Sequence, residues 1–296
     1  MVVPDASQLA AMSRLFSSAV FREMATRGRS AIFGRLFGLT GVQDACPADA
    51  TVGNGFDAVF SVLKRVGLRD EYVYRAAVTH KVLMGKHSLR TAAMLTEFRA
   101  GACKADLVIL NGTATVFEIK SERDSLARLA NQVANYKKVF ASVNVIASEA
   151  HVAGVLETVP EDVGVICLSR RYQIQTVRDA EDRPDRVCPA TVFESLRSAE
   201  ARAVLTMLGA AIPEVPNTQA YAAMRAIFAE LDPTKVHLAM VTTLKRTRNL
   251  APLSDLVDRL PPSLHAAALS IQVCRREHDR LVKAVSTPLA CAMAWA

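Results

Sequence analysis

Between Met94 and Lys120 the apolar pattern changes from a helical period to that of short strands. Three segments, Met94–Arg99, Lys104–Leu110 and Ala114–Lys120, are rich in apolar and β-branched residues. Asn111-Gly112-Thr113 separates the last two, and Asn-Gly between apolar runs is the strongest short-range signal for a hairpin. The near-continuous apolar run after Asp106 is typical of a strand that is covered on both faces. The sequence therefore predicts a meander of three strands with helices packed against it.

Helical and strand-like segments alternate around this meander. Residues 70 to 87 precede it and have the spacing of a helix, and residues 124 to 141 follow it with a second helical pattern. Strands are expected at Val143–Ala147 and Val163–Leu168, with a short helix near His151–Glu157 between them. Strands that alternate with helices are typical of an α/β core with a mixed sheet flanked by helices.

The rest of the chain is predicted to be helical and suggests three regions. A helical N-terminal region covers residues 1–66, in which Gly34 and Gly38 are expected to interrupt the helical pattern and Gly41 to Gly55 to form a loop. The core covers residues 67–178, and the charged, proline-bearing stretch Asp179–Pro189 is expected to be a linker. Residues 190–296 form a helical C-terminal region in which we recognise no motif.

Composition limits the class of protein. The 296 residues are 51% hydrophobic and contain no apolar run near the roughly 18 residues of a membrane span, so a soluble globular protein is expected. The six cysteines are scattered without a CxxC pair, which predicts buried thiols in a reducing, cytoplasmic setting and argues against zinc or disulfides. Lys and Arg exceed Asp and Glu by seven, and such a surplus favours polyanionic partners.

Acidic residues occur on strands where a purely structural role is costly. If Arg99 pairs with Lys104 across the first hairpin, Glu97 lies opposite Asp106 on one face, about 5 Å away. Two carboxylates at that distance repel each other unless a cation compensates. This pairing favours a metal site over a structural role.

The third strand adds Glu118 and Lys120, which are two residues apart and point to the same side. A three-residue loop at Asn111–Thr113 places Glu118 opposite Asp106, whereas a two-residue loop would separate them. With the longer loop, Glu97, Asp106 and Glu118 offer oxygen ligands of the kind that Mg²⁺ or Mn²⁺ prefers. Lys120 would then orient the attacking water or stabilise charge on a phosphate.

These residues resemble the signature of the PD-(D/E)XK nuclease superfamily, in which an Asp on one strand is followed by Glu-x-Lys on the next. Here the matching residues are Ala105-Asp106 and Glu118-Ile119-Lys120, with Ala105 in place of the usual proline. Gln132 and Tyr136 on the following helix resemble the Gln-x-x-x-Tyr motif of RecB-type exonuclease domains. The resemblance implies a restriction-endonuclease-like core, with Gln132 and Tyr136 shaping the site or contacting the substrate.

A closer similarity, over about residues 65 to 170, is to an uncharacterised bacterial family within that superfamily. It is carried by four motifs: Glu71-Tyr72-Val73-Tyr74, Leu95-Thr96-Glu97-Phe98-Arg99, Asn111-Gly112-Thr113, and Glu118 to Ser125. The superfamily often places an acid on the helix before the sheet, so either Glu71 or Glu97 could supply the remaining metal ligand. The strand pairing favours Glu97.

The resemblance implies an Mg²⁺-dependent (or Mn²⁺-dependent) nuclease that hydrolyses DNA phosphodiester bonds, in bacterial DNA processing or defence. Asp106, Glu118 and Lys120 would be catalytic, and Glu97, Asp106 and Glu118 would bind the metal. The alternative is a non-catalytic module on the same fold that binds nucleic acid or protein; an RNA nuclease is a third hypothesis. DNA is the expected partner, membrane association is not expected, and a protein partner or a homo-oligomer is left open. The basic clusters Lys245-Arg246-Thr247-Arg248 and Arg275-Arg276 are further candidates for backbone contacts.

Overall fold

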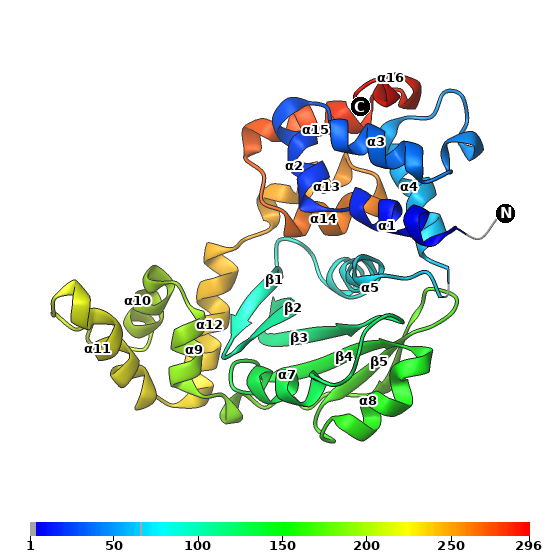
Figure 1. Ribbon diagram of the computed structural model, residues 1–296. Coiled ribbons are helices and arrows are strands. Elements are labelled where there is room, and N and C mark those ends of the chain that lie inside the picture. Colours follow the sequence, from blue (N-terminus) through cyan, green and yellow to red (C-terminus); the bar gives the residue numbers. More distant parts are fainter. Residues whose placement is uncertain (1–3, 66) are drawn as a thin grey trace. The chain divides into compact units, whose positions relative to one another are not determined.

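The chain divides into two compact units. A computed structural model describes residues 4–65 and 67–296 (Figure 1). The first unit, here called the helical unit, joins residues 1–80 to residues 252–296, and the second, the sheet unit, comprises residues 81–251. This division differs from the one expected from the sequence. The two ends of the chain fold together, and residues 190 to 251 belong with the sheet.

The helical unit is built from short helices around an aromatic core. Its helices are α1 Ala6–Leu15, α2 Ser18–Arg27, α3 Ala31–Leu39, α4 Val52–Leu63, α5 Glu71–Val78, α13 Ser254–Asp258, α14 His265–Ser270, α15 His278–Val285 and α16 Leu289–Met293. The rings of Phe16 and Phe33 lie 5.6 and 5.1 Å from that of Phe56, all three buried. The expectation of helices in this part of the chain is confirmed.

Two expectations about glycines in the helical unit are wrong. Gly34 and Gly38 lie inside α3, and the glycines at 53 and 55 lie inside α4, which begins at Val52 after an N-cap at Thr51. Thr51 and Asn54 bond reciprocally as a capping box, which begins the helix despite its glycines. A Cβ on Gly34 would meet the Ala292 carbonyl oxygen at 3.1 Å. Gly34 is therefore explained by packing against the C-terminal segment, which sequence periodicity does not reveal.

The sheet unit contains one sheet of six strands in the order β1-β2-β3-β4-β5-β6. The strands are β1 Ala93–Ala100, β2 Cys103–Asn111, β3 Thr113–Lys120, β4 Ser142–Ser148, β5 Gly164–Leu168 and β6 Ile174–Arg178. The β1–β2, β2–β3 and β5–β6 pairs are antiparallel, whereas β3–β4 and β4–β5 are parallel. The predicted α/β class with a mixed sheet is confirmed, and β6 is an additional strand that the sequence analysis missed.

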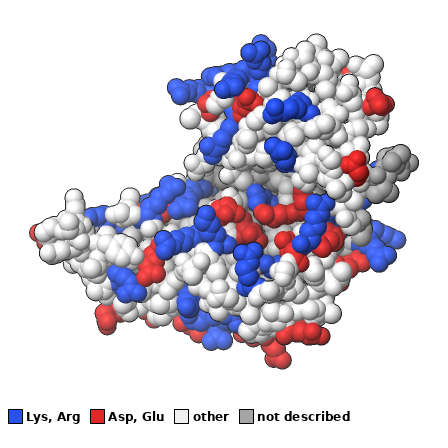
Figure 2. Space-filling view, in the orientation of Figure 1, with Lys and Arg blue, Asp and Glu red and all other residues white. Residues whose placement is uncertain are grey.

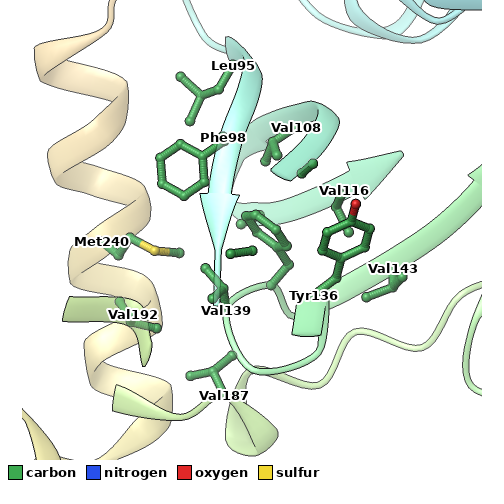
Figure 3. Close-up of a cluster of buried hydrophobic side chains, with 14 of the residues drawn as sticks. Leu95, Phe98, Val108, Val116, Tyr136, Val139, Val143, Val187, Val192 and Met240 are labelled. Atoms are coloured by element: carbon green, nitrogen blue, oxygen red, sulfur yellow. The ribbon is translucent and has the colours of Figure 1, made fainter. Parts of the chain in front are cut away.

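Helices cover one face of this sheet with a continuous apolar core. α7 Leu129–Tyr136, α8 Val152–Thr158, α9 Pro189–Ser195 and α12 Pro233–Thr247 contact the strands. α10 Ser198–Met207 packs on α12 and α11 Asn217–Ala229 on α9, and the short α6 Met84–Lys86 precedes the sheet. Figure 3 shows Phe98 of β1 facing Met240 of α12, with Tyr136 of α7 beside Val116 of β3. Because α7 is anchored on this core, its side chains Gln132 and Tyr136 are held in place beside β2 and β3.

The strand registers agree with the expected ones. Arg99 pairs with Lys104 in the first hairpin, and Leu110 pairs with Ala114 in the second, so the second loop has the longer form. Helix α7 is shorter than the helical pattern expected over residues 124 to 141.

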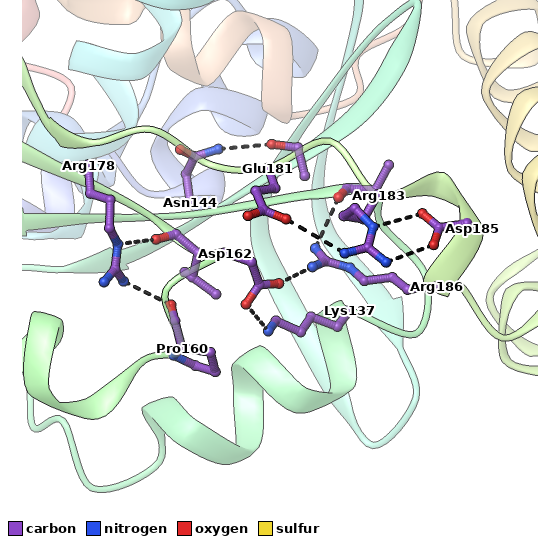
Figure 4. Close-up of polar contacts among 12 residues, drawn as sticks. Lys137, Asn144, Pro160, Asp162, Arg178, Glu181, Arg183, Asp185 and Arg186 are labelled. Carbon is purple, nitrogen blue, oxygen red and sulfur yellow. Dashed lines mark hydrogen bonds and ion pairs between the residues drawn. The ribbon is translucent and has the colours of Figure 1, made fainter.

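The predicted linker is held to the rest of the sheet unit by Arg186, through an ion pair with Asp162 and a hydrogen bond to a backbone carbonyl (Figure 4). Asp162 accepts from Lys137 Nζ at 2.5 Å and also contacts Arg186, whose guanidinium donates to the Ala141 carbonyl at 3.0 Å. Burial raises the pKa of Asp162, but the hydrogen bond and charge of Lys137 and the charge of Arg186 outweigh it, so its pKa lies below the usual value. The segment is therefore part of the folded unit.

The buried His237 makes the sheet unit sensitive to acid. It lies on α12, its Nε2 accepts from the Ala114 amide at 3.4 Å, and burial lowers its pKa to about 4. The imidazole binds a proton more readily in the unfolded chain than in the folded one. The contribution of His237 to the unfolding free energy is therefore fully present above about pH 6.5 and is lost as the pH falls toward 4. We expect this group alone to cost about 2 kcal/mol between pH 7 and pH 5.

Urea unfolding followed by far-UV circular dichroism at pH 7 and pH 5 tests this expectation. His237→Gln keeps an acceptor for the Ala114 amide but has no group that titrates in this range. Its unfolding free energy should change less between the two pH values, by about 2 kcal/mol. Equal changes in the two proteins would show that His237 is not the acid-sensitive group.

Two further expectations concern the cysteines and membranes. All six cysteines are free, as expected, but Cys167 alone is buried and Cys274 and Cys291 are exposed, so the expectation of buried thiols is wrong for most of them. Within residues 4–65 and 67–296, no helix has the length and apolar character required to cross a bilayer.

Candidate functional site

Strands β1 and β2 both change phase where the first two predicted acids lie. In a regular strand every second side chain faces the core. Here the core-facing residues are Ala93, Leu95, Phe98 and Ala100 of β1, and Leu110, Val108 and Ala105 of β2. The alternation of core-facing and outward-facing side chains is therefore interrupted once in each strand, at Glu97 in β1 and at Asp106 in β2. Thr96 still pairs with Leu107 and Phe98 with Ala105, so the register continues across the irregularity.

The irregularity brings two carboxylates together. Glu97 has a φ of +52°, which residues other than glycine adopt rarely and at an energetic cost. In this conformation a Glu97 oxygen lies within 4.8 Å of an Asp106 oxygen. Asp106 also contacts β3, because its Oδ2 accepts from the Ile119 amide at 2.8 Å. The predicted proximity of Glu97 and Asp106 is confirmed, although they are not a regular ladder pair.

Glu118 and Lys120 form a buried ion pair on β3. Lys120 Nζ donates to Glu118 Oε1 at 2.8 Å, and the lysine and glutamate side chains are 5% and 2% exposed. Burying two charges costs desolvation energy that only good geometry and further hydrogen bonds repay. Helix α7 supplies those hydrogen bonds.

Gln132 and Tyr136 lie one helical turn apart on α7 and both reach this pair. Gln132 Oε1 accepts from Lys120 Nζ at 2.9 Å. The Tyr136 hydroxyl lies 2.7 Å from Glu118 Oε2 and 2.8 Å from the Lys104 carbonyl oxygen, and its single proton serves one of them at a time. Burial, followed by the charge and hydrogen bond of Glu118, raises the pKa of Tyr136 far above its ordinary value. Tyr136 therefore remains a neutral donor toward the carboxylate.

The pair of Glu97 and Asp106 lies near Glu118, but the carboxylates differ in what they contact. The Asp106 carboxylate accepts from the amide of Ile119, the residue between Glu118 and Lys120, so Asp106 lies close to the Glu118 network. Among the described residues, Glu118 does not join Glu97 and Asp106 as a set of carboxylates within 4.8 Å of one another. Its two oxygens are instead engaged by Lys120 and Tyr136. Its role as a third metal ligand remains a prediction.

Glu71, the alternative ligand, belongs to the helical unit. It is the first residue of α5, which Asp70 caps, and its carboxylate contacts Arg75 one turn further along the helix. An acid in the first turn also interacts favourably with the helix dipole, which accounts for Glu71 in structural terms.

The turn after β3 contains a contact that the sequence analysis missed. Asp124 Oδ2 accepts from the Ser121 amide at 2.8 Å and from its hydroxyl at 2.6 Å, so the chain turns sharply directly after Lys120. The signal was Ser-x-x-Asp, a spacing typical of local side-chain capping.

The fold and site define an α/β unit with a mixed sheet whose polar residues gather on β1–β3 and α7. A family model described as bacteriophage P4 protein cII matches residues 64–251, and this chain therefore belongs to that family. Protein cII of Enterobacteria phage P4 is 28% identical over 188 residues, which are 61% of this chain and 69% of that protein. The match covers the sheet unit and α5.

One solved structure also resembles this chain. It is a protein of unknown function from Silicibacter pomeroyi, 18% identical, which covers 46% of this chain and 88% of its own with a TM-score of 0.31. A likeness at that score carries no inference about fold or function.

Proposed function

We propose that the sheet unit is a metal-dependent nuclease centre that hydrolyses DNA phosphodiester bonds, on a restriction-endonuclease-like core of the PD-(D/E)XK superfamily. The observation that carries the proposal is that residues predicted for this chemistry contact one another in two neighbouring groups. Glu97 and Asp106 approach as carboxylates, and Gln132 and Tyr136 of α7 contact the Glu118–Lys120 pair. The order of the strands and α7 is consistent with such a core.

The donor set suits a hard divalent cation. Glu97 and Asp106 offer carboxylate oxygens, the ligands that Mg²⁺ and Mn²⁺ prefer, and Glu118 lies on the adjoining strand. Such an ion supplies positive charge that polarises the scissile phosphate. The ion would also relieve the repulsion between Glu97 and Asp106.

The side chains of the chain itself supply positioning. Lys120 is held by Glu118 on one side and Gln132 on the other, so its ammonium group has a defined direction. Its third proton can be donated to the attacking water or to a phosphate oxygen. Tyr136 holds the second oxygen of Glu118 and so keeps the partner of Lys120 in place.

A binding module without catalysis, for nucleic acid or protein, is the second candidate, and one observation favours it. Glu118 and Lys120 are only 1% and 4% exposed, and they neutralise each other. A catalytic lysine must reach the substrate, so on this alternative the pair would only stabilise the sheet.

Glu97→Gly separates the two candidates. The purified full chain is incubated with supercoiled plasmid, single-stranded DNA or RNA, with Mg²⁺ or Mn²⁺ and with EDTA. We expect cleavage of DNA that needs the metal and falls by at least about 100-fold in Glu97→Gly. Because glycine tolerates a positive φ, the unfolding free energy should stay equal or rise, by up to about 1 kcal/mol.

Glu161→Gln, which changes an exposed acid of the same unit, is the control and should cleave like the parent protein. If the parent cleaves none of the substrates with either metal, the binding module is favoured. Cleavage of RNA but not DNA would favour the RNA nuclease. Undiminished cleavage by Glu97→Gly would exclude Glu97 as a ligand.

A further inference from the structure

The helical unit carries a basic surface that the proposed centre does not use. Arg22 lies on α2 and Arg29 lies just after the helix, next to its C-cap Gly28, and both side chains are exposed. Near α15, Arg276, Arg280 and Lys283 are exposed at spacings of four and three residues and share a face. These five side chains are called the α2–α15 surface below.

The two segments meet at a direct contact. Arg280 donates to the Thr26 carbonyl oxygen, and Thr26 lies on the same side of α2 as Arg22, because its hydroxyl donates to the Arg22 carbonyl at 2.8 Å. A Cβ on Gly28 would lie 4.0 Å from Arg280 Cγ, so the end of α2 is close to α15 as well. Figure 2 shows Lys and Arg side chains gathering over these helices.

Few acids offset this charge. Among the described residues, Arg22, Arg29, Arg276 and Lys283 are in no ion pair. Glu23 is 15% exposed and turns toward α3, where the Ser30 hydroxyl bonds it and holds its pKa below the usual value. Asp279 is paired with Arg259 at 2.9 Å. The surface therefore presents uncompensated positive charge.

We infer that the α2–α15 surface binds the phosphate backbone of DNA without reading its sequence. Exposed arginines on adjoining helices suit a polyanion with regularly spaced charges, and affinity then comes from phosphate contacts and counterion release. The choice of DNA among polyanions rests on the proposed function. Of the two basic clusters singled out in the sequence, only Arg275-Arg276 belongs here, because Arg248 of the other pairs with the buried Glu200.

Binding is measured on the full chain by fluorescence anisotropy with a labelled duplex of random sequence, in EDTA and from 50 to 200 mM salt. The test variant carries Arg22→Gln, Arg29→Gln and Arg276→Gln. The control carries Arg14→Gln, Arg90→Gln and Arg171→Gln, which remove the same number of exposed charges from other positions, and circular dichroism checks that both fold. We expect the Kd of the test variant to rise at least about tenfold, and the slope of log K against log salt to fall by about 2 to 3.

An equal Kd and slope in the test and control variants would overturn the inference. So would a test variant that loses binding to phosphatidylserine vesicles but keeps its affinity for DNA, because the surface would then recognise anionic lipid. Since EDTA removes the metal, the result does not depend on cleavage. A protein that cleaves DNA but binds it equally well without these arginines would refute this inference alone, and weakened binding without any cleavage would refute the nuclease alone.

Discussion

Lys120→Met should abolish DNA cleavage and destabilise the sheet unit at the same time. The substitution removes the ammonium group that lies 2.8 Å from Glu118 and 2.9 Å from Gln132. Among the described residues, the Tyr136 hydroxyl is then the remaining side-chain partner of the buried Glu118 charge. Breaking a buried pair in this way costs about 3 to 5 kcal/mol, and cleavage should fall by at least about 100-fold.

A loss of activity in an unstable variant is ambiguous, and Glu118 offers the means to resolve it. In the double variant Glu118→Gln with Lys120→Met, both charges are absent, and the amide oxygen that replaces the carboxylate can still accept from Tyr136. Replacing a buried ion pair by neutral groups of similar volume is often close to neutral for stability. We therefore expect the double variant to regain most of the lost unfolding free energy without regaining cleavage.

Urea unfolding and the plasmid assay measure the two quantities on the same proteins. Lys138→Met, which removes an exposed lysine just after α7, is the matched control and should leave both unchanged. If the double variant recovers cleavage together with stability, Lys120 acts only as a structural residue. If Lys120→Met is as stable as the parent protein, the pair contributes less than its burial implies.

The local features of the site could be predicted from the sequence because they follow from short-range rules. Asn111-Gly112 determines the second hairpin, and the apolar alternation on each side determines the register that brings β3 beside β2. The helical spacing of Gln132 and Tyr136 places both on one side of α7, where they meet the residues of β3.

The conformation of Glu97 could not be predicted in the same way. A phase change in a strand leaves a gap of three between core-facing residues, here from Leu95 to Phe98, and this gap is visible in the sequence only once the strand is known. A positive φ at a glutamate also contradicts local preference, so it depends on the surrounding sheet. Residues at functional sites often break local rules in this manner.

The division into two units could not be predicted because it depends on contacts between segments far apart in the sequence. Contacts between the two ends of the chain, such as the backbone bond from the Leu289 amide to the Ala50 carbonyl at 2.7 Å, join segments far apart in the sequence. Strand β6 was missed because its middle residues are exposed, so it lacks the apolar alternation that marks the other strands.

Glu200 is a buried acid outside the candidate site whose loss should strongly destabilise the sheet unit. It is 3% exposed on α10 and accepts from Arg248 Nε at 2.9 Å and from a second guanidinium nitrogen at 3.0 Å. Burial raises its pKa, but the Arg248 hydrogen bond, the Arg197 amide and the Arg248 charge outweigh it, so the carboxylate titrates below its usual range. Arg248 in turn lies 5.3 Å from the centre of the Phe98 ring, so the pair joins α10, the end of α12 and β1.

Glu200→Ala should therefore lower the unfolding free energy by about 3 kcal/mol, because the mostly buried Arg248 loses its only carboxylate partner among the described residues. Thr247→Val removes a hydroxyl that lies 3.2 Å from Glu200 Oε1 and 3.1 Å from the Thr243 carbonyl oxygen, and should cost about 1 kcal/mol, because the guanidinium of Arg248 stays on the carboxylate. The measurement is urea unfolding followed by circular dichroism, with amide exchange in α10 and α12 to locate the change. The difference between the parent and Glu200→Ala should shrink as the pH falls through the depressed pKa of Glu200, since protonation removes the charge that the alanine lacks. A difference that is small at pH 7, or that does not change in acid, would show that the Glu200 carboxylate does not hold these three elements together.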